Sequence, residues 1–221
     1  MPKLFVGLML TVVLSLVGLA LVNASMSQYL TAFIALAALV VSVVSAFKED
    51  IFPFRPLVLF EEMLLVAPTA PSHNSPAILC PITFINKGYG SGVIEGLTLK
   101  VETETNAKIY TPVLEVDYQK FISGKRALHA ENILGAFNLF ALGSRESIKK
   151  HIVFSQEENS GRYPFSPWSP GKHVFRLFIK HTGSREPVDV CSVTNDISEK
   201  LITDYKAGTS ASLNPSRELH V

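Results

Sequence analysis

Charged residues are almost absent from the first 47 residues of this 221-residue chain, where Lys3 is the only one. Residues 4–22 and 29–47 form two uncharged apolar runs of 19 residues each. As a helix, a run of this length spans roughly 28 Å, close to the ~30 Å hydrocarbon core of a bilayer. The connecting residues 23–28 are polar and form a loop short enough to join antiparallel helices. The sequence therefore predicts a transmembrane helical hairpin over residues 1–47.

A cleaved signal peptide is a second interpretation of the same segment. Lys3 precedes an apolar run, and residues 22–24 offer small side chains near a cleavage position. The run is longer than the about 7–15 apolar residues of a usual signal peptide, and a second apolar run follows it. The hairpin is therefore preferred, whereas a mature protein that began at Ser25 would support the signal peptide.

Small residues recur at intervals of four in both apolar runs, which on a helix places them along one face. Such faces let helix backbones approach each other in a membrane, where no hydrophobic force drives helices together. We predict that these residues pack within the hairpin or between copies of the chain. They are Gly7, Thr11, Ser15, Ala38, Ser42 and Ala46.

An excess of positive charge and a set of cysteines are both missing from the rest of the chain. Only Lys3 of the 20 Lys and Arg residues precedes residue 48, so the remainder balances the 19 Asp and Glu residues. A domain that binds nucleic acid is normally basic, so this balance argues against a nucleic-acid partner. Cys80 and Cys191 are too few for a disulfide scaffold. We expect both thiols to be reduced.

Proline and aromatic residues mark the boundary that follows the second apolar run. Pro53 and Pro56 end the helix, and Phe52, Phe54 and Arg55 suit the membrane interface. Residues 48–56 are therefore predicted to be an interfacial linker. Residues 57–206 are predicted to form the folded domain, and residues 207–221 a flexible tail.

Short apolar runs with period-two alternation dominate the folded domain, as in Ile78, Cys80, Ile82 and Phe84. Seven or eight such strands, with no βαβ alternation, predict an all-β antiparallel sandwich that is Ig-like in the broad sense. The glycine-rich segment Asn86–Gly92 is predicted to be a turn between two adjacent antiparallel strands. At least one of its glycines is expected at positive φ.

The segment from Pro81 to Ile94 reads PITFINKGYGSGVI. It resembles the strand, Asn-x-Gly-x-Gly, strand turn of many uncharacterised bacterial membrane-anchored proteins. In those proteins an apolar hairpin and an Arg-Pro segment, here Arg55-Pro56, precede an Ig-like sandwich. The resemblance covers roughly residues 1–102, and it implies a fold and an orientation but no activity.

No motif for catalysis, a cofactor or a metal stands out. Three Ser-x-x-Lys matches lack the partner motifs of the hydrolases that use them, and the glycine-rich segment lacks the Lys of a phosphate-binding loop. We therefore expect no enzymatic activity, no cofactor and no metal. Trp168, in a segment rich in proline and aromatic residues, is either a core residue or a contact for a partner.

The distribution of positive charge around the apolar runs predicts the topology. Lys3 precedes the first run, the loop has no basic residue, and Lys48 and Arg55 follow the second run. Both ends are therefore expected in the cytoplasm of a bacterium, with a multi-pass anchor in the inner membrane. The preferred function is a membrane-anchored, non-enzymatic interaction module whose cytoplasmic β-sandwich contacts protein or lipid. The alternative is a ligand-gated effector, in which the β domain senses a small molecule and the hairpins assemble.

Overall fold

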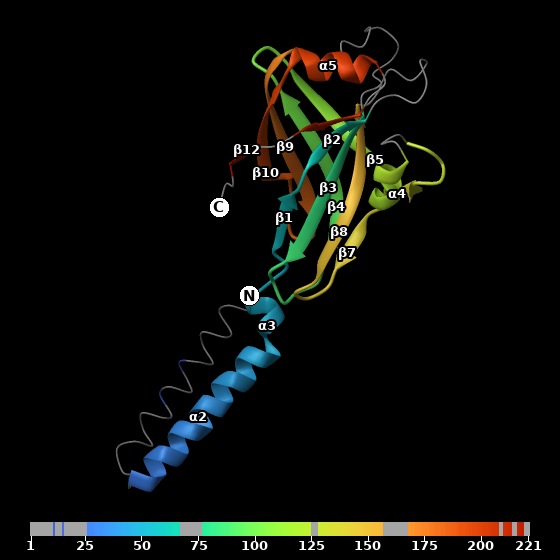
Figure 1. The fold of residues 1–221 in the computed structure, drawn as a ribbon. Helices are drawn as coiled ribbons and strands as arrows, with labels where there is room; N and C mark the ends of the chain where they lie inside the picture. Colours follow the sequence, from blue (N-terminus) through green and yellow to red (C-terminus); the bar gives the residue numbers. More distant parts are fainter. Residues whose placement is uncertain are drawn as a thin grey trace.

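The computed structural model describes Thr11, Ser15 and residues 26–66, 77–124, 128–156, 168–207, 210–213 and 216–218. It consists of a long helix that leads into a β domain (Figure 1). The first predicted span, residues 4–22, lies outside the described residues apart from Thr11 and Ser15, which are helical. The described residues therefore include a helix for the second predicted span, and the hairpin stays a prediction.

The second apolar run forms helix α2 (Met26–Ala46), and the short helix α3 (Lys48–Ile51) follows it. α2 begins three residues before the predicted span, so part of the predicted loop is helical. Residues Tyr29–Ala46 have a mean hydropathy of 2.3, which makes α2 long and apolar enough to cross a membrane. One candidate membrane helix near the N-terminus is therefore present among the described residues.

Among the described residues, twelve strands form one hydrogen-bonded sheet, the body of the β domain. Two further helices, α4 (Tyr118–Ser123) and α5 (Glu199–Lys206), lie between strands along the chain. The strands are β1 (Pro56–Phe60), β2 (Met63–Val66), β3 (Ala77–Asn86), β4 (Gly92–Glu102), β5 (Ala107–Val116), β6 (Ile133–Ala136), β7 (Phe140–Leu142), β8 (Ser147–Gln156), β9 (Gly171–His181), β10 (Val188–Ile197), β11 (Ala211–Leu213) and β12 (Ser216–Glu218).

The sheet is antiparallel, and its longest strands follow the order β3-β8-β5-β4-β9-β10. β1 pairs with β3 and also lies beside β10, so the sheet is nearly closed. Register shifts at Pro112/Leu114 in β5 and Ile94/Gly96 in β4 bend the strands and let one sheet curl around its own core. The prediction of a mostly antiparallel β domain is confirmed, whereas the two packed sheets of a sandwich are here one continuous sheet.

The predicted turn at Asn86–Gly92 does not join neighbouring strands. β8 and β5 lie between β3 and β4 in the sheet. The described glycines with positive φ are Gly135, Gly171 and Gly183, so none in the 86–92 segment adopts that conformation. Both parts of the turn prediction are wrong, because these glycines make room for the backbone and side chains of Pro53 and Phe54.

The core lies inside the curled sheet and contains one inward side chain from every second position of the long strands. Phe84 on β3, Leu99 on β4, Phe154 on β8 and Phe175 on β9 are all fully buried there. α5 covers the end of the sheet that lies farthest from α2 (Figure 1). Part of the predicted tail joins the sheet, since β11 pairs with β2 and β12 with β10.

The ends of α4 and α5 carry the capping residues that sequence rules favour. The Asp117 side chain accepts hydrogen bonds from the backbone N–H groups of Gln119 and Lys120 at the start of α4. Ser198 accepts one from Leu201 at the start of α5. Beneath α4, a second apolar cluster around Phe121 and Val153 fills the outer side of the sheet.

Cys80 is fully buried on the inner face of β3, as the alternation predicts, and burial raises the pKa of its thiol. Cys191 is only half-buried, and neither residue forms a disulfide.

In the folded protein we expect a maleimide reagent to modify Cys191 at least about 100-fold faster than Cys80, because Cys80 reacts only after unfolding. Mass spectrometry of quenched samples measures both rates. Equal rates would contradict the buried placement, and a Cys191→Ser variant isolates the Cys80 rate.

Candidate functional site

The linker between α3 and β1 is attached to the end of the sheet by backbone hydrogen bonds. The carbonyl oxygen of Phe52 accepts from the N–H groups of Tyr89 and Gly90, at 2.8 and 3.2 Å. The carbonyl oxygen of Arg55 accepts from the N–H of Lys87 at 2.9 Å. The chain after the apolar helix is therefore joined to the loop that follows β3, and we call these two segments together the junction (residues 52–55 and 86–92).

Asn86 connects three chain segments through its side-chain amide. Its Oδ1 accepts hydrogen bonds from the backbone N–H groups of Arg55, at 3.2 Å, and Gly88, at 2.9 Å. Its Nδ2 donates to the carbonyl oxygens of Gly90 and Gly143, both at 2.8 Å. An amide side chain can accept two hydrogen bonds and donate two, so Asn86, which is 1% exposed, has every position occupied.

The glycines of the junction allow the linker to lie directly on the loop. A Cβ atom at Gly88 would lie 1.8 Å from the carbonyl oxygen of Pro53, and one at Gly92 would lie 2.4 Å from the ring of Phe54. A Cβ atom at Gly90 would also be tightly placed, 3.1 Å from the backbone nitrogen of Phe54. Close approach of a second backbone is therefore the reason for this glycine run.

Positive charge gathers around one aromatic ring at the junction. The guanidinium carbon of Arg145 lies 4.5 Å from the centre of the Tyr89 ring, and Nζ of Lys48 lies 5.9 Å from it. Phe52 packs against the same ring at 5.8 Å. Arg145 adopts a left-handed backbone with φ of 56°, and its N–H donates to the carbonyl of Gly88 at 3.2 Å. Two cationic side chains, the Tyr89 ring and the exposed side chain of Phe52 therefore lie together where the helical segment meets the sheet.

The predicted packing residues of α2 stay a prediction. Ala38, Ser42 and Ala46 are all exposed, and Ser42 donates to the carbonyl of Ala38 at 2.8 Å. Ser15 donates to the carbonyl of Thr11 at the same distance, and Gly7 lies outside the described residues.

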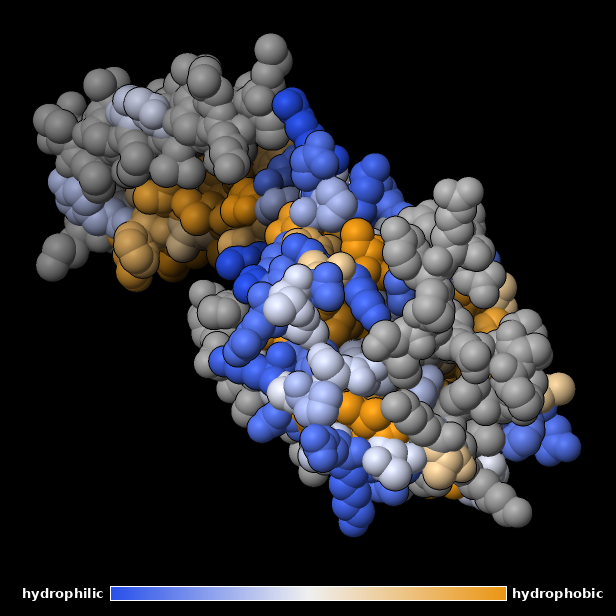
Figure 2. Space-filling view, turned by 90° about the horizontal axis from the view of Figure 1, so that it is seen from above, coloured by the Kyte–Doolittle hydropathy of each residue, from blue (hydrophilic) through white to orange (hydrophobic). Residues whose placement is uncertain are grey.

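Most large apolar side chains of α2 are also exposed, as the continuous orange surface of the helical arm in Figure 2 shows. Phe33 is 70% exposed, and Leu30 and Val41 are each 64% exposed. An apolar surface of this extent is unfavourable in water unless a membrane or a partner covers it.

Trp168 belongs to the core, which is one of its two predicted roles. It is 6% exposed and stacks on Tyr110 and Phe175, with ring centres 6.3 and 6.2 Å away. Its Nε1 is buried and has no hydrogen-bond partner among the described residues. A buried N–H without a partner costs about 1–3 kcal/mol, so this donor calls for an explanation.

A cavity of about 180 Å³ lies beside Trp168, at the end of the sheet where β4 turns into β5. Its lining includes Thr103 and Lys108 from the β4–β5 hairpin, Ser169 from the chain before β9, and His173 from β9 itself. Partial burial lowers the pKa of the Lys108 ammonium. The sequence alone did not predict this cavity, although a lysine at an inward position of an alternating strand is a signal for it.

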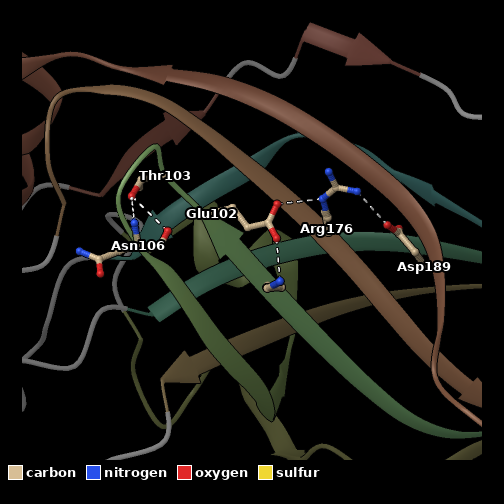
Figure 3. A network of polar contacts seen from close by, with 6 residues as sticks. Glu102, Thr103, Asn106, Arg176 and Asp189 are labelled. Atoms are coloured by element: carbon tan, nitrogen blue, oxygen red, sulfur yellow. Dashed lines mark hydrogen bonds and ion pairs between the residues drawn. The ribbon is translucent and has the colours of Figure 1, made fainter.

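On the outer face of the same strands, a chain of ion pairs crosses β4, β9 and β10 (Figure 3). Glu102 contacts Lys100 at 2.7 Å and Arg176 at 3.0 Å, and Arg176 reaches Asp189 at 3.3 Å. Hydrogen bonds from Lys100 and then Arg176 lower the pKa of the Glu102 carboxyl. These groups are partly exposed, so each pair contributes at most about 1 kcal/mol.

Within the described residues, no three His, Cys, Asp or Glu side chains gather closely enough to hold a metal ion.

The close contact at Gly88 can be tested by comparing the stability of alanine variants at two glycines. Gly88→Ala should destabilise the protein by about 1–3 kcal/mol, because the new methyl group collides with a backbone carbonyl that cannot move freely. The melting temperature followed by near-ultraviolet circular dichroism should fall by at least about 2 °C. Gly96→Ala is the matched control, since its Cβ would meet only the Cβ of Lys180 at an ordinary 3.7 Å. Equal melting temperatures for the two variants would contradict the close contact at Gly88.

Comparisons with known proteins add no relative to this description. No family model matches the chain, and no curated protein matches it. The functional conclusions therefore depend on the geometry of the junction, the apolar helix and the cavity.

Proposed function

We propose that this protein is a membrane-anchored, non-enzymatic interaction module whose β domain is held in a fixed orientation at the membrane surface. The observation that carries the proposal is the junction. An apolar helix with an exposed surface continues, after one short helix, into a linker that Asn86 and backbone hydrogen bonds attach to the sheet. A flexible tether would need none of these contacts.

The anchor in this proposal is a hairpin of residues 4–22 and 29–47 in a bacterial inner membrane. The uncharged length of α2 and its exposed apolar side chains support the second span. The small residues Gly7, Thr11, Ser15, Ala38, Ser42 and Ala46 would pack the hairpin or join copies of the chain. An Ig-like relationship is not part of the proposal, because the strands belong to one sheet.

Lipid headgroups are natural contacts for the junction. Lys48 and Arg145 gather around Tyr89, and the side chain of Phe52 is 48% exposed beside them. Aromatic and basic side chains are the usual residues at the membrane interface. The partner that the module presents to the cytoplasm would then bind the surfaces farther from α2.

A second function, the ligand-gated effector, is favoured by one observation. β4 runs from the cavity at Val101 and Thr103 to Gly92 at the junction. A ligand that changed the position of β4 at the cavity would act on the strand that begins beside Phe54. This arrangement offers a direct physical connection between a small-molecule site and the membrane anchor.

The orientation is tested by fusions at Val221. Alkaline phosphatase should be inactive there and a fluorescent protein bright, because the positive charges of Lys48 and Arg55 favour the cytoplasmic side of the membrane for the β domain. Alkaline carbonate should leave the full chain in the membrane pellet. Active phosphatase at this position would place the domain outside the cytoplasm and overturn the proposed location.

The fixed junction is tested by hydrogen exchange on the full chain in lipid nanodiscs. Asn86→Ala should speed exchange at the amides of Lys87, Tyr89 and Gly90 by about tenfold or more, because the linker carbonyls that they contact lose their support. Asn195→Ala is the control, since that buried residue lies in β10 and its Nδ2 has no partner among the described residues. Unchanged exchange in the Asn86 variant would show that the junction does not depend on this side chain.

A further inference from the structure

We propose that the junction end of the β domain binds the phosphate groups of anionic phospholipids, with Lys48 and Arg145 as the main cationic contacts. This proposal rests on the membrane-anchored module proposed above, and it adds the class of lipid that the module selects. It is supported by the depth at which α2 ends, by cations that lack a carboxylate partner, and by the apolar side chains beside them.

The length of α2 gives the depth of the junction in the anchored module. The apolar segment Tyr29–Ala46 has 18 residues and spans about 27 Å as a helix, close to the ~30 Å hydrocarbon core. Lys48 begins α3 directly beyond that segment, and the linker attached to the sheet follows α3. With α2 across the bilayer, the end of the sheet beside α3 would lie at the phosphate groups (Figure 1).

Two cations share one aromatic ring at this depth. The guanidinium of Arg145 and the ammonium of Lys48 both lie within 6 Å of the centre of the Tyr89 ring, at 4.5 and 5.9 Å. Like charges that are held close to each other repel, and a bound anion removes the repulsion. An Arg guanidinium binds phosphate through two parallel hydrogen bonds, and a Lys ammonium adds a point charge. The pair therefore favours a ligand that carries phosphate.

Arg145 has a backbone conformation that is unfavourable for its residue type. Its φ of 56° lies in the left-handed region, which glycine adopts far more easily than arginine. The N–H of Arg145 donates to the carbonyl oxygen of Gly88 at 3.2 Å, which holds the residue against the junction. Backbone outliers of this kind are concentrated at functional sites. The outlier here indicates that the arginine side chain is needed at this position.

A second pair of cations extends the β1–β3 ladder. Pro56 lies opposite Asn86, and the next backbone hydrogen bond, from the N–H of Lys87 to the carbonyl oxygen of Arg55 at 2.9 Å, places Arg55 opposite Lys87. Both basic residues are exposed. Like charges directly opposite each other in an antiparallel pair are destabilising. A layer of anionic headgroups would remove that cost.

Carboxylates do not neutralise these four cations within the described part of the chain. None of the four forms an ion pair there. Glu49 and Asp50 lie in α3 without pairing with them, and Glu146 accepts a hydrogen bond from the backbone N–H of Gly143. The first 25 residues contain no Asp or Glu, so they supply no carboxylate either. An external anion therefore has four cations to bind at this end of the domain.

Exposed apolar side chains beside the cations favour a lipid over a free phosphate ion. Phe52 is 48% exposed and packs against Tyr89 at 5.8 Å, and Ile51 is 36% exposed. Such side chains are typical of the boundary between headgroups and acyl chains. A free phosphate ion would bind the cations but leave these apolar surfaces in water. The occupant is therefore an anionic phospholipid, for which phosphatidylglycerol is the probe.

The test measures lipid binding by native mass spectrometry of the full chain in detergent micelles. Dioleoyl phosphatidylglycerol is compared with dioleoyl phosphatidylcholine, which has the same acyl chains and no net charge. We expect phosphatidylglycerol to bind at least about fivefold more tightly, because each cation near the phosphate contributes about that factor. Glycerol 3-phosphate, which lacks acyl chains, should bind at least about tenfold more weakly than phosphatidylglycerol.

Variants assign the lipid preference to the junction. Lys48→Gln should weaken phosphatidylglycerol binding by about fivefold. Lys200→Gln is the matched control and should leave it unchanged, because this exposed lysine lies in α5, at the end of the sheet farthest from α2 (Figure 1). Arg145→Gly should also weaken binding by about fivefold or more. Its melting temperature should change by less than about 3 °C, because glycine adopts positive φ without strain.

The melting temperature of each variant confirms that it folds. Equal affinity for the two lipids, equal affinity for glycerol 3-phosphate and phosphatidylglycerol, or full binding by the folded Lys48→Gln and Arg145→Gly variants would each overturn the proposal. An equal loss in Lys200→Gln would overturn it too, because the effect would then depend on net charge alone. A chain that stays in the alkaline carbonate pellet without preferring phosphatidylglycerol would contradict this proposal only. A chain released by carbonate would contradict the anchored module, and this proposal with it.

Discussion

The side-chain amide of Asn86 and the glycines after it decide how the apolar helix meets the sheet. Asn86 uses both acceptor and both donor positions on backbone groups of the linker, its own loop and the loop before β8. Gly88 and Gly92 remove the Cβ atoms that would push the linker away. Because a buried amide with four partners is costly to leave unpaired, the three segments keep one arrangement. The contacts of Tyr89 with Phe52 and Arg145 depend on that arrangement.

The middle of the domain is filled, and its two ends are where polar groups gather. Leu97, Leu99 and Phe175 close the interior between the junction and the cavity. A close-packed interior is hard to compress, so a displacement at one end reaches the other end mainly when a whole strand or helix moves. β4 is such an element, with Gly92 under Phe54 at one end and Val101 at the cavity at the other. The ion pair between Glu102 and Arg176 ties β4 to β9 and holds the Glu102 carboxylate on the outer face.

Local periodicity explains what could be predicted from the sequence. The uncharged run from residue 29 forms α2, and the alternation around Cys80 places that thiol in the core. Pairing between distant segments explains what could not. β3 pairs with β8 rather than with β4, so Asn86–Gly92 is a packing surface rather than a hairpin turn. No local pattern distinguishes a glycine that turns the chain from one that another backbone touches. The inward direction of Lys108 could not be predicted either, because only its pairing with Val101 shows which face of the sheet it lies on.

The position of β1 has a mechanical consequence. β1 follows the linker directly and pairs with β3 from Pro56↔Asn86 to Phe60↔Ile82. Tension along α2, from a membrane that thins or a neighbouring helix that tilts, would enter the domain at Pro56. The hydrogen bonds of Phe52 and Arg55 to the loop after β3 would take part of this load. The rest would pull along β1 and load its hydrogen bonds to β3 together in shear, rather than opening them one after another as in a zipper. β1 also borders the place where the sheet nearly closes, beside β10. The strand that bears the load is therefore the one whose slip would open the seam of the sheet.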